Sequence, residues 1–256
     1  MNVKHAAYRW LSKFHRLAGV PKTPKAGQRV LLFHAVGSDI PGDPYGLSVS
    51  PGVFARYMDR VAALREHWRP SPFGAPAADR LEVSIVFDDG FRDTLHAAAP
   101  ILAERQIPFT VFVTAGFVKG ESPAHLSPSE LKRLAEQPGV QIGAHGFTHA
   151  RLDLAGDAAL ERELVDSKKY LEDLTGKPVK SMSYPHGLVT RRVAVAARKA
   201  GYTLGATSRY GLNVKGRDPM LLCRAEIVSF DTPDDLELKL RGHWDWFRLR
   251  HADPAA

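Results

Sequence analysis

With 256 residues, of which 44% are hydrophobic, the chain is long enough to bury the core of one large domain. Its single cysteine, Cys223, excludes an internal disulfide and every metal site that is built from several cysteines. The net charge of +7 is not spread along the chain as a basic stripe with interleaved aromatic residues, so we expect no nucleic-acid partner.

The basic excess lies at the N-terminus. Residues 1–30 contain seven lysine and arginine residues and no acidic residue, and the other 28 basic residues equal the 28 acidic ones. Apolar residues at three- and four-residue spacing predict one face of a helix that ends near Gly19. This apolar face consists of Val3, Ala7, Trp10, Phe14 and Leu17. The arm over residues 1–28 either docks on the domain formed by residues 29–256 or makes peripheral membrane contact through residues 1–20.

Strand and helix patterns alternate through the rest of the chain. An apolar run over residues 29–36 predicts a buried strand, and residues 50–67 open with a Ser-Pro helix start. The later predicted strands cover 82–87, 109–115, 140–145, 180–184, 202–208 and 221–228. The later predicted helices cover 92–106, 127–137, 157–176 and 190–201, and a last one begins near residue 232. This alternation predicts a parallel sheet, either closed into a barrel or left open.

Several predicted strands end in residues that can do chemistry. In parallel α/β folds, ligands bind at the carboxyl ends of the strands, so these positions are the first candidates for a site. The candidates are His34, Asp88, Asp89, His145, His149 and His186. Each residue alone is more often structural, because Asp-Asp-Gly is a common turn and two histidines four residues apart need a third ligand nearby.

Taken together, these residues predict a catalytic metal site. Two imidazoles and one carboxylate form a three-ligand set for a zinc-like ion, and such a set leaves one coordination position for water. The second carboxylate of the Asp88–Asp89 pair is then free to act on protons. Adjacent residues of a strand point to opposite sides, but a turn at Gly90 lets both carboxylates face one pocket.

Three segments in this order resemble the polysaccharide deacetylase family, which includes the nodulation-factor chitooligosaccharide deacetylases and is also called carbohydrate esterase family 4. They are "VFDDG", "HGFTH" and "SYPHG", and the resemblance covers roughly residues 29 to 230. It implies a deformed (β/α)7-type barrel in a single domain. It also implies metal-dependent removal of an acetyl group from an N-acetylated sugar.

The resemblance implies a role for each matching position. Asp88 matches the catalytic base, and the metal ligands match Asp89, His145 and His149. The turn at Pro185 is expected to aim the backbone N–H of His186 at the developing oxyanion.

The chain departs from the family pattern at two places. The family often has an arginine two residues before the proline of its third motif, and this chain has Ser183 there. Arg224 is our candidate for the missing cation, with a purely structural ion pair as the alternative. The family's C-terminal Leu-x-His matches only residues 249–251 in a charged tail, which we do not assign as the acid. We assign the acid to His34 or His186, with a structural role as the alternative for His34.

The sequence leaves three functions to be compared. The first is deacetylation of an amino sugar in a surface polysaccharide, a lipopolysaccharide or a lipid-linked or nucleotide-linked precursor. The second is metal-dependent hydrolysis of a cyclic imide or another small amide on the same barrel, and the third is sugar binding without catalysis. The expected cofactor is a divalent metal, foremost Zn²⁺, with Co²⁺, Ni²⁺ or Fe²⁺ as alternatives. Because no signal sequence is recognisable, we expect a cytoplasmic protein, in part at the inner face of the membrane.

Overall fold

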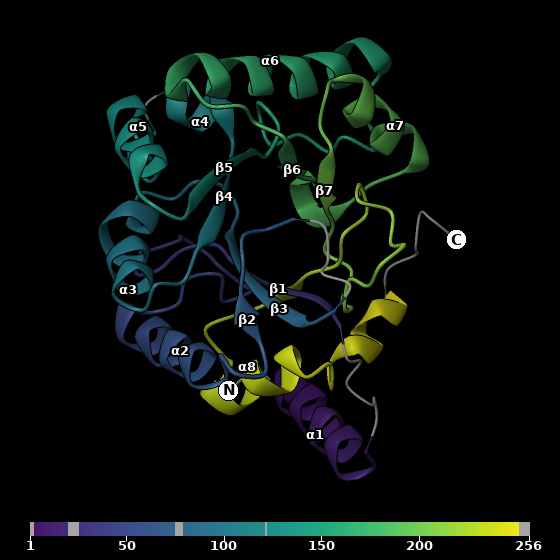
Figure 1. Ribbon diagram of the computed structural model, residues 1–256. Coiled ribbons are helices and arrows are strands. Elements are labelled where there is room, and N and C mark those ends of the chain that lie inside the picture. Colours follow the sequence, from purple (N-terminus) through teal and green to yellow (C-terminus); the bar gives the residue numbers. More distant parts are fainter. Residues whose placement is uncertain (1–2, 20–25, 75–78, 121, 251–256) are drawn as a thin grey trace.

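The computed structural model describes residues 3–19, 26–74, 79–120 and 122–250. A curled parallel sheet forms its centre, and helices cover the outer face of that sheet (Figure 1). The strands are β1 (Gly27–Phe33), β2 (Arg69–Pro70), β3 (Leu81–Phe87), β4 (Phe109–Val113), β5 (Val140–Ala144), β6 (Ser181–Ser183), β7 (Leu204–Ala206) and β8 (Ala225–Glu226). The α-helices are α1 (Val3–Leu17), α2 (Pro51–Ala63), α3 (Ala99–Glu104), α4 (Ala115–Lys119), α5 (Pro128–Glu136), α6 (Asp157–Thr175), α7 (Arg191–Lys199) and α8 (Pro233–Leu240). A π-helical turn covers Thr94–Ala98, and 3₁₀ turns cover Pro185–Gly187 and Asp245–Arg250.

The strands pair in the order β7-β6-β5-β4-β3-β1-β8, and β2 joins β3 outside this path. All pairings between the named strands are parallel. Two further bridges join the sheet to segments outside the named strands, Ala206 of β7 with Leu222 and Gln28 of β1 with Asn213. The predicted deformed (β/α)7-type barrel in a single domain is confirmed. Because β1 begins at Gly27, the last two residues of the predicted arm belong to the sheet.

Alternate residues of the central strands enter two different cores. Val30 and Leu32 of β1 belong to a small cluster inside the curl of the sheet, together with Val86 of β3 and Phe112 of β4. Their neighbours in the chain belong to the larger core between the sheet and the helices. This alternation follows from the two-residue period of a strand, and it explains why β1, β3 and β4 are apolar almost throughout.

Local signals in the sequence set the starts of several helices. At α5 the Ser127 hydroxyl accepts a hydrogen bond from the Glu130 N–H, at 3.3 Å, and Glu130 accepts one from the Ser127 N–H, at 3.0 Å. At α8, Thr232 and Asp235 form the same reciprocal pair. Each pair satisfies two backbone N–H groups that a helix start leaves unbonded, so the predicted starts near 127 and 232 are confirmed.

The predicted helix over 92–106 is not regular. It begins with the π-helical turn at Thr94–Ala98 and becomes α-helical only in α3. Pro100 explains the change, because it has no N–H to donate to the carbonyl of His96 and its ring would clash with that carbonyl in an α-helix.

The predicted strand over 221–228 is reduced to β8. The side chain of Asn213 takes the backbone groups of Cys223 that a longer ladder would use. Asn213 Oδ1 accepts from the Cys223 N–H, at 2.7 Å, and Asn213 Nδ2 donates to the Cys223 carbonyl, at 2.9 Å. Cys223 is a buried free thiol, as its apolar surroundings predict.

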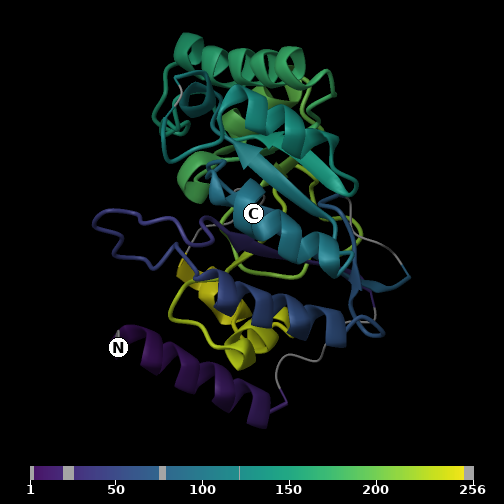
Figure 2. The ribbon, with the colours of Figure 1, turned by 90° about the vertical axis from the view of Figure 1, so that its left-hand side faces the viewer.

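Helix α1 packs on the C-terminal part of the chain (Figures 1 and 2). The Tyr8 ring meets the rings of Trp246 and Phe247 edge-on, with centroids 5.5 and 5.6 Å apart. Arg9 Nε donates to Asp235 Oδ1 at 3.0 Å. Trp246 and Phe247 lie beyond α8, which ends at Leu240, and they join α1 to the rest of the domain. None of the described helices is long and apolar enough to cross a membrane.

Candidate metal centre and catalytic site

The inward-facing register of the strands brings the predicted site residues together. Asp88 lies two residues beyond Val86, and His34 lies two residues beyond Leu32, so each continues the inner face of its strand. His145 follows β5, where its N–H donates to the Val113 carbonyl of β4, at 2.9 Å. The site therefore lies at the carboxyl ends of the strands, where the sequence predicts it.

Asp89, His145 and His149 form one group of potential metal ligands. Asp89 Oδ1 lies 3.4 Å from His145 Nε2 and 3.4 Å from His149 Nε2. Donor atoms that bind a tetrahedral zinc ion at about 2.0–2.2 Å are separated by about 3.3–3.6 Å. The three residues therefore fit a zinc-like ion, and two neutral imidazoles with one carboxylate are a donor set that such an ion accepts.

The tautomer of His145 is fixed by the neighbouring strand. His145 Nδ1 lies 2.9 Å from the Ser183 carbonyl oxygen, which can only accept a hydrogen bond. The imidazole proton is therefore on Nδ1, and the lone pair of Nε2 is directed to the side of Asp89. A histidine that binds metal usually has its other nitrogen held in this way.

Backbone conformation also marks the site. Among the described residues, Asp89, His149, His186 and Gln106 are the non-glycine residues with positive φ. Three of these four lie at the site, with φ values of 70°, 64° and 60°. At Asp89 the left-handed conformation turns the chain, so that both carboxylates of the Asp88–Asp89 pair approach His145 Nε2, at 3.8 and 3.4 Å. Each such residue costs about 1–3 kcal/mol, a strain that is common in functional sites.

Asp88 lies beside the ligand group and is held from two sides. Arg224 Nη1 donates to Asp88 Oδ1 at 2.7 Å, and Ser183 Oγ donates to Asp88 Oδ2 at 3.0 Å. Burial raises the pKa of Asp88, but the charge of Arg224 and the hydrogen bond that Arg224 donates outweigh it and hold the pKa well below its usual range. Asp88 is therefore ionised and fixed in orientation.

Ser183 is the residue whose contribution the sequence did not predict. Its position lacks the arginine that the family often has there, yet its hydroxyl holds Asp88 and its carbonyl holds His145. Arg224 supplies the cation from the other end of the sheet, as the sequence analysis proposed. In the sequence, only the position of Ser183 directly before Tyr184 and Pro185 indicated that it lies near the site.

Glu163 of α6 holds the loop between the two histidines. Its carboxylate accepts from the N–H groups of Phe147, at 2.7 Å, and Thr148, at 3.0 Å. It also accepts from the Thr148 hydroxyl, at 2.5 Å. A Cβ on Gly146, where φ is 72°, would lie 2.9 Å from Glu163 Oε2, so the loop requires glycine there. Sequence reasoning missed Glu163 because it lies in a regular amphipathic helix.

His34 and His186 lie on different sides of the site. His34 is half-buried, and its Nδ1 is buried without a hydrogen-bond partner among the described residues. It directly follows Phe33, which pairs with Phe87, so His34 lies beside Asp88. His186 is exposed, with its ring centroid 4.6 Å from that of His149. Desolvation and the charge of His149 lower the pKa of His186. The role of its backbone N–H stays a prediction, and His251 lies outside the described residues.

Aromatic rings extend from the ligand group. The Phe117 ring lies 6.2 Å from that of His149 and 4.5 Å from that of His125, and His125 stacks on Phe91 at 4.8 Å. Desolvation is the main cause that lowers the pKa of His125. These rings form a partly apolar cluster beside the ligands, and aromatic side chains of this kind commonly help to orient a bound ligand. No motif in the sequence pointed to His125.

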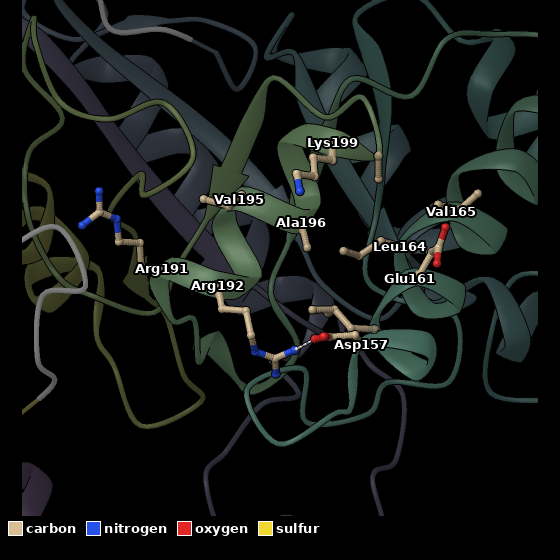
Figure 3. Close-up of a pocket in the computed structure, with 11 residues that line it drawn as sticks. Asp157, Glu161, Leu164, Val165, Arg191, Arg192, Val195, Ala196 and Lys199 are labelled. Carbon is tan, nitrogen blue, oxygen red and sulfur yellow. Dashed lines mark hydrogen bonds and ion pairs between the residues drawn. The ribbon is translucent and has the colours of Figure 1, made fainter.

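A second hollow lies away from this site. A groove of about 670 Å³ runs between α6 and α7, with Leu164 and Ala196 among its apolar lining and the Arg192–Asp157 ion pair, 2.8 Å, at one side (Figure 3). Its lining includes none of the residues described above. The chemistry therefore belongs to the strand ends and not to this groove.

Comparison with known proteins identifies the family. The model of the family described as polysaccharide deacetylase matches residues 76–205, which is about half of the chain and includes the ligand group, Asp88 and His186. The chain belongs to the polysaccharide deacetylase family. The predicted family is confirmed, and its members are hydrolases that act on carbon–nitrogen bonds.

Two relatives illustrate the similarity of the chain to this family. The putative polysaccharide deacetylase YxkH of Bacillus subtilis is 28% identical over 145 residues, which are 57% of this chain and 51% of the relative. The poly-β-1,6-N-acetyl-D-glucosamine N-deacetylase of Staphylococcus aureus is 31% identical over 137 residues, 48% of this chain and 46% of the relative. The chain thus spans about half the length of the curated relatives that it matches.

Solved structures show the same fold. The deacetylase PplD of Streptococcus pyogenes, solved in complex with acetate, has a TM-score of 0.74 and 23% identity, covering 85% of this chain and 99% of that one. IcaB of Ammonifex degensii has a TM-score of 0.71 and 22% identity, and the match covers 86% of this chain and 97% of IcaB. At this identity the likeness is one of fold.

Proposed function

We propose that the protein is a metal-dependent hydrolase that removes an N-acetyl group from an amino sugar of a polysaccharide. The observation that carries the proposal is the position of Asp88 directly beside the group formed by Asp89, His145 and His149. One carboxylate is placed to bind metal and the other is placed to accept a proton. Membership in the polysaccharide deacetylase family supports the same reaction.

A divalent metal held by Asp89, His145 and His149 would polarise the amide carbonyl and lower the pKa of a water molecule from 15.7 to about 7. Asp88 then accepts the proton of the attacking water. Arg224 and Ser183 each hold one of its oxygens, so the carboxylate keeps one orientation as the proton arrives. A positioned base of this kind contributes a factor of about 10² to 10⁴ to the rate.

The leaving amine needs a proton when the carbon–nitrogen bond breaks. His34 is placed for this role, because it ends the strand beside Asp88 and its buried Nδ1 has no partner among the described residues. Imidazole groups exchange protons readily near neutral pH, because their ordinary pKa is about 6.5. His186 is the alternative donor, at the exposed side of His149.

The substrate is proposed as an N-acetylated surface polysaccharide, a lipopolysaccharide or a lipid-linked or nucleotide-linked precursor. The staphylococcal relative is named for deacetylation of poly-β-1,6-N-acetyl-D-glucosamine, which supports an N-acetylglucosamine unit. The ring cluster that includes Phe117 and His125 lies next to the ligand group and can contact such a unit.

Metal content and acetate release test the proposal on one set of variants. The wild type is expected to contain close to one divalent metal per chain and to release acetate from N-acetylglucosamine oligosaccharides. Asp89→Ala is expected to lose both metal and activity, whereas Asp88→Asn keeps the metal and loses turnover. Full activity in Asp88→Asn would remove the base assignment.

A panel of small cyclic imides, run with the same preparations, separates the alternative reaction. Turnover of an imide without release of acetate from any N-acetylated sugar would favour hydrolysis of small amides. Sugar binding by a metal-loaded protein without turnover of either class would favour the non-catalytic function.

A further inference from the structure

We propose that α1 docks the protein on the surface of a bilayer that contains anionic lipids. The docking face, here called the α1 stripe, consists of Ala7, Trp10, Phe14 and Leu17. Trp10, Phe14 and Leu17 are 70%, 54% and 82% exposed, and the Trp10 and Phe14 rings stack with centroids 6.0 Å apart. Three large apolar side chains on one helix face form a contiguous patch, which a soluble surface rarely exposes without a partner.

The α1 stripe is free for lipid because α1 attaches to the protein by another face. Ser12 is buried and accepts a hydrogen bond from Trp246 Nε1, at 3.3 Å. Tyr8 packs on the same C-terminal aromatic residues. At about 100° per residue, Ser12 and Tyr8 lie on the side of the helix opposite Trp10 and Leu17. Attachment to the barrel and contact with a membrane, which the sequence presented as alternatives, are therefore compatible.

Charge decides in favour of an anionic lipid surface as the partner. The sequence of α1 contains no acidic residue. Arg9 is engaged by Asp235 and by the Phe230 carbonyl, and Arg16 lines a small pocket with Asp234 and Glu237. Lys13 is exposed on the flank of the α1 stripe. An apolar face bordered by cations is the pattern of a helix that lies in the plane of a membrane interface. Each such cation contributes about a fivefold gain in binding to an anionic surface.

The attachment also sets where the site would lie on the membrane. Arg9 Nη2 donates to the Phe230 carbonyl at 2.7 Å, and the neighbouring Ser229 N–H donates to the Gly46 carbonyl at 2.7 Å. Gly46 belongs to the loop that leaves the carboxyl end of β1, and Figure 2 shows this loop and the start of α1 on the same side. Docking through the α1 stripe would thus fix the orientation of the strand-end site relative to the bilayer. If the proposed function holds, the polysaccharide or its precursor would then be met at the membrane surface.

Vesicle co-sedimentation of the full-length protein tests the docking without using enzyme activity. The probes are vesicles of phosphatidylcholine alone and vesicles of phosphatidylcholine mixed with phosphatidylglycerol. The wild type is expected to sediment with the mixed vesicles and to be released by high salt. The triple variant Trp10→Ser, Phe14→Ser, Leu17→Ser is expected to bind at least about 100-fold more weakly. The single variant Lys13→Gln is expected to bind about fivefold more weakly.

The matched control carries serine at three exposed valines outside α1, which are Val165, Val195 and Val214. It removes exposed apolar side chains from other faces and is expected to bind as the wild type does. All variants change exposed side chains, so equal thermal unfolding midpoints would show that they are folded. Binding of the triple α1 variant at wild-type strength would overturn the proposal. A wild type that binds neither kind of vesicle would also overturn it. If the wild type is a dimer and the triple α1 variant is a monomer, the α1 stripe serves self-association and the proposal is likewise overturned.

Discussion

Arg224 Nη1 lies 2.7 Å from Asp88 Oδ1 although 136 positions separate the two residues in the sequence, and both side chains are almost fully buried. Arg224 also donates from Nε to the Thr207 carbonyl, at 2.7 Å, which fixes its orientation. The pair crosses the inside of the barrel from the segment before β8 to the end of β3. A family position that usually carries an arginine is thus filled by serine, and the cation comes from another strand.

Substitution of Arg224 is expected to affect turnover and not metal binding. In Arg224→Met, Asp88 keeps its charge without a counter-ion, which costs about 3–5 kcal/mol for a buried pair. We expect kcat for acetate release to fall at least 100-fold while the metal content stays at the wild-type level. The double variant Asp88→Asn, Arg224→Met removes the unpaired charge and should unfold at a higher temperature than Arg224→Met alone. Additive losses of stability would show that the two side chains act independently.

Substitution of Glu163 is expected to loosen the metal centre through the loop that it holds. Glu163→Gln would present an NH₂ group to donors that now meet a carboxylate, so one of the N–H groups of Phe147 and Thr148 would lose its acceptor. We expect this variant to bind metal about 10- to 100-fold more weakly and to recover much of its kcat at saturating metal. Glu161→Gln, which changes an exposed neighbour on α6, is the control. A kcat that stays low at saturating metal would contradict a positioning role.

The sequence could predict the barrel and the ligands because both depend on local patterns. Runs rich in apolar residues, such as residues 82–87, indicate buried strands by themselves. Asp88 lies two positions after Val86, so it must face inward with Val86. The potential metal ligands lie within two short segments, 88–89 and 145–149, so their spacing is visible in the sequence.

The supports of the site could not be predicted in the same way. Ser183 and Glu163 reach the site only because the sheet curls and α6 crosses behind the loop, which are consequences of the whole fold. Neither residue differs in kind from an ordinary strand serine or helix glutamate. The role of α1 was also left open, because periodicity shows that a helix has an apolar face but not which face meets the protein.

Acid should remove one contribution to stability at the start of α5. Burial raises the pKa of Glu130, but hydrogen bonds from the Ser127 N–H, His96 and Arg92 outweigh it and lower the pKa from 4.5 to about 2. Because the folded pKa lies below the unfolded one, the carboxylate stabilises the fold above about pH 4.5, and this contribution disappears as the pH falls towards 2. Glu130→Gln should therefore be less stable than the wild type by about 1 kcal/mol or more at pH 7, with a gap that narrows below pH 4.5. Urea unfolding at pH 7 and below pH 4.5 measures this difference in the free energy of unfolding, with the exposed Glu136→Gln as control. A difference that does not change with pH would contradict the assignment.

His34 is expected to act on the leaving amine and not on the metal. Its imidazole ends β1 beside Asp88, and glutamine at this position keeps a polar side chain without an exchangeable proton of suitable pKa. We expect His34→Gln to bind metal as the wild type does, to lose about 10²- to 10⁴-fold in kcat, and to lose the basic limb of its pH–rate profile, because the group that must be protonated is gone. His67→Gln, which changes an exposed histidine outside the site, should leave the profile unchanged. An N-acetylated substrate with a better leaving group needs less protonation and should recover part of the rate in His34→Gln. If His34→Gln keeps the basic limb of the pH–rate profile and a normal kcat, the acid role passes to His186 and His34 is a structural residue.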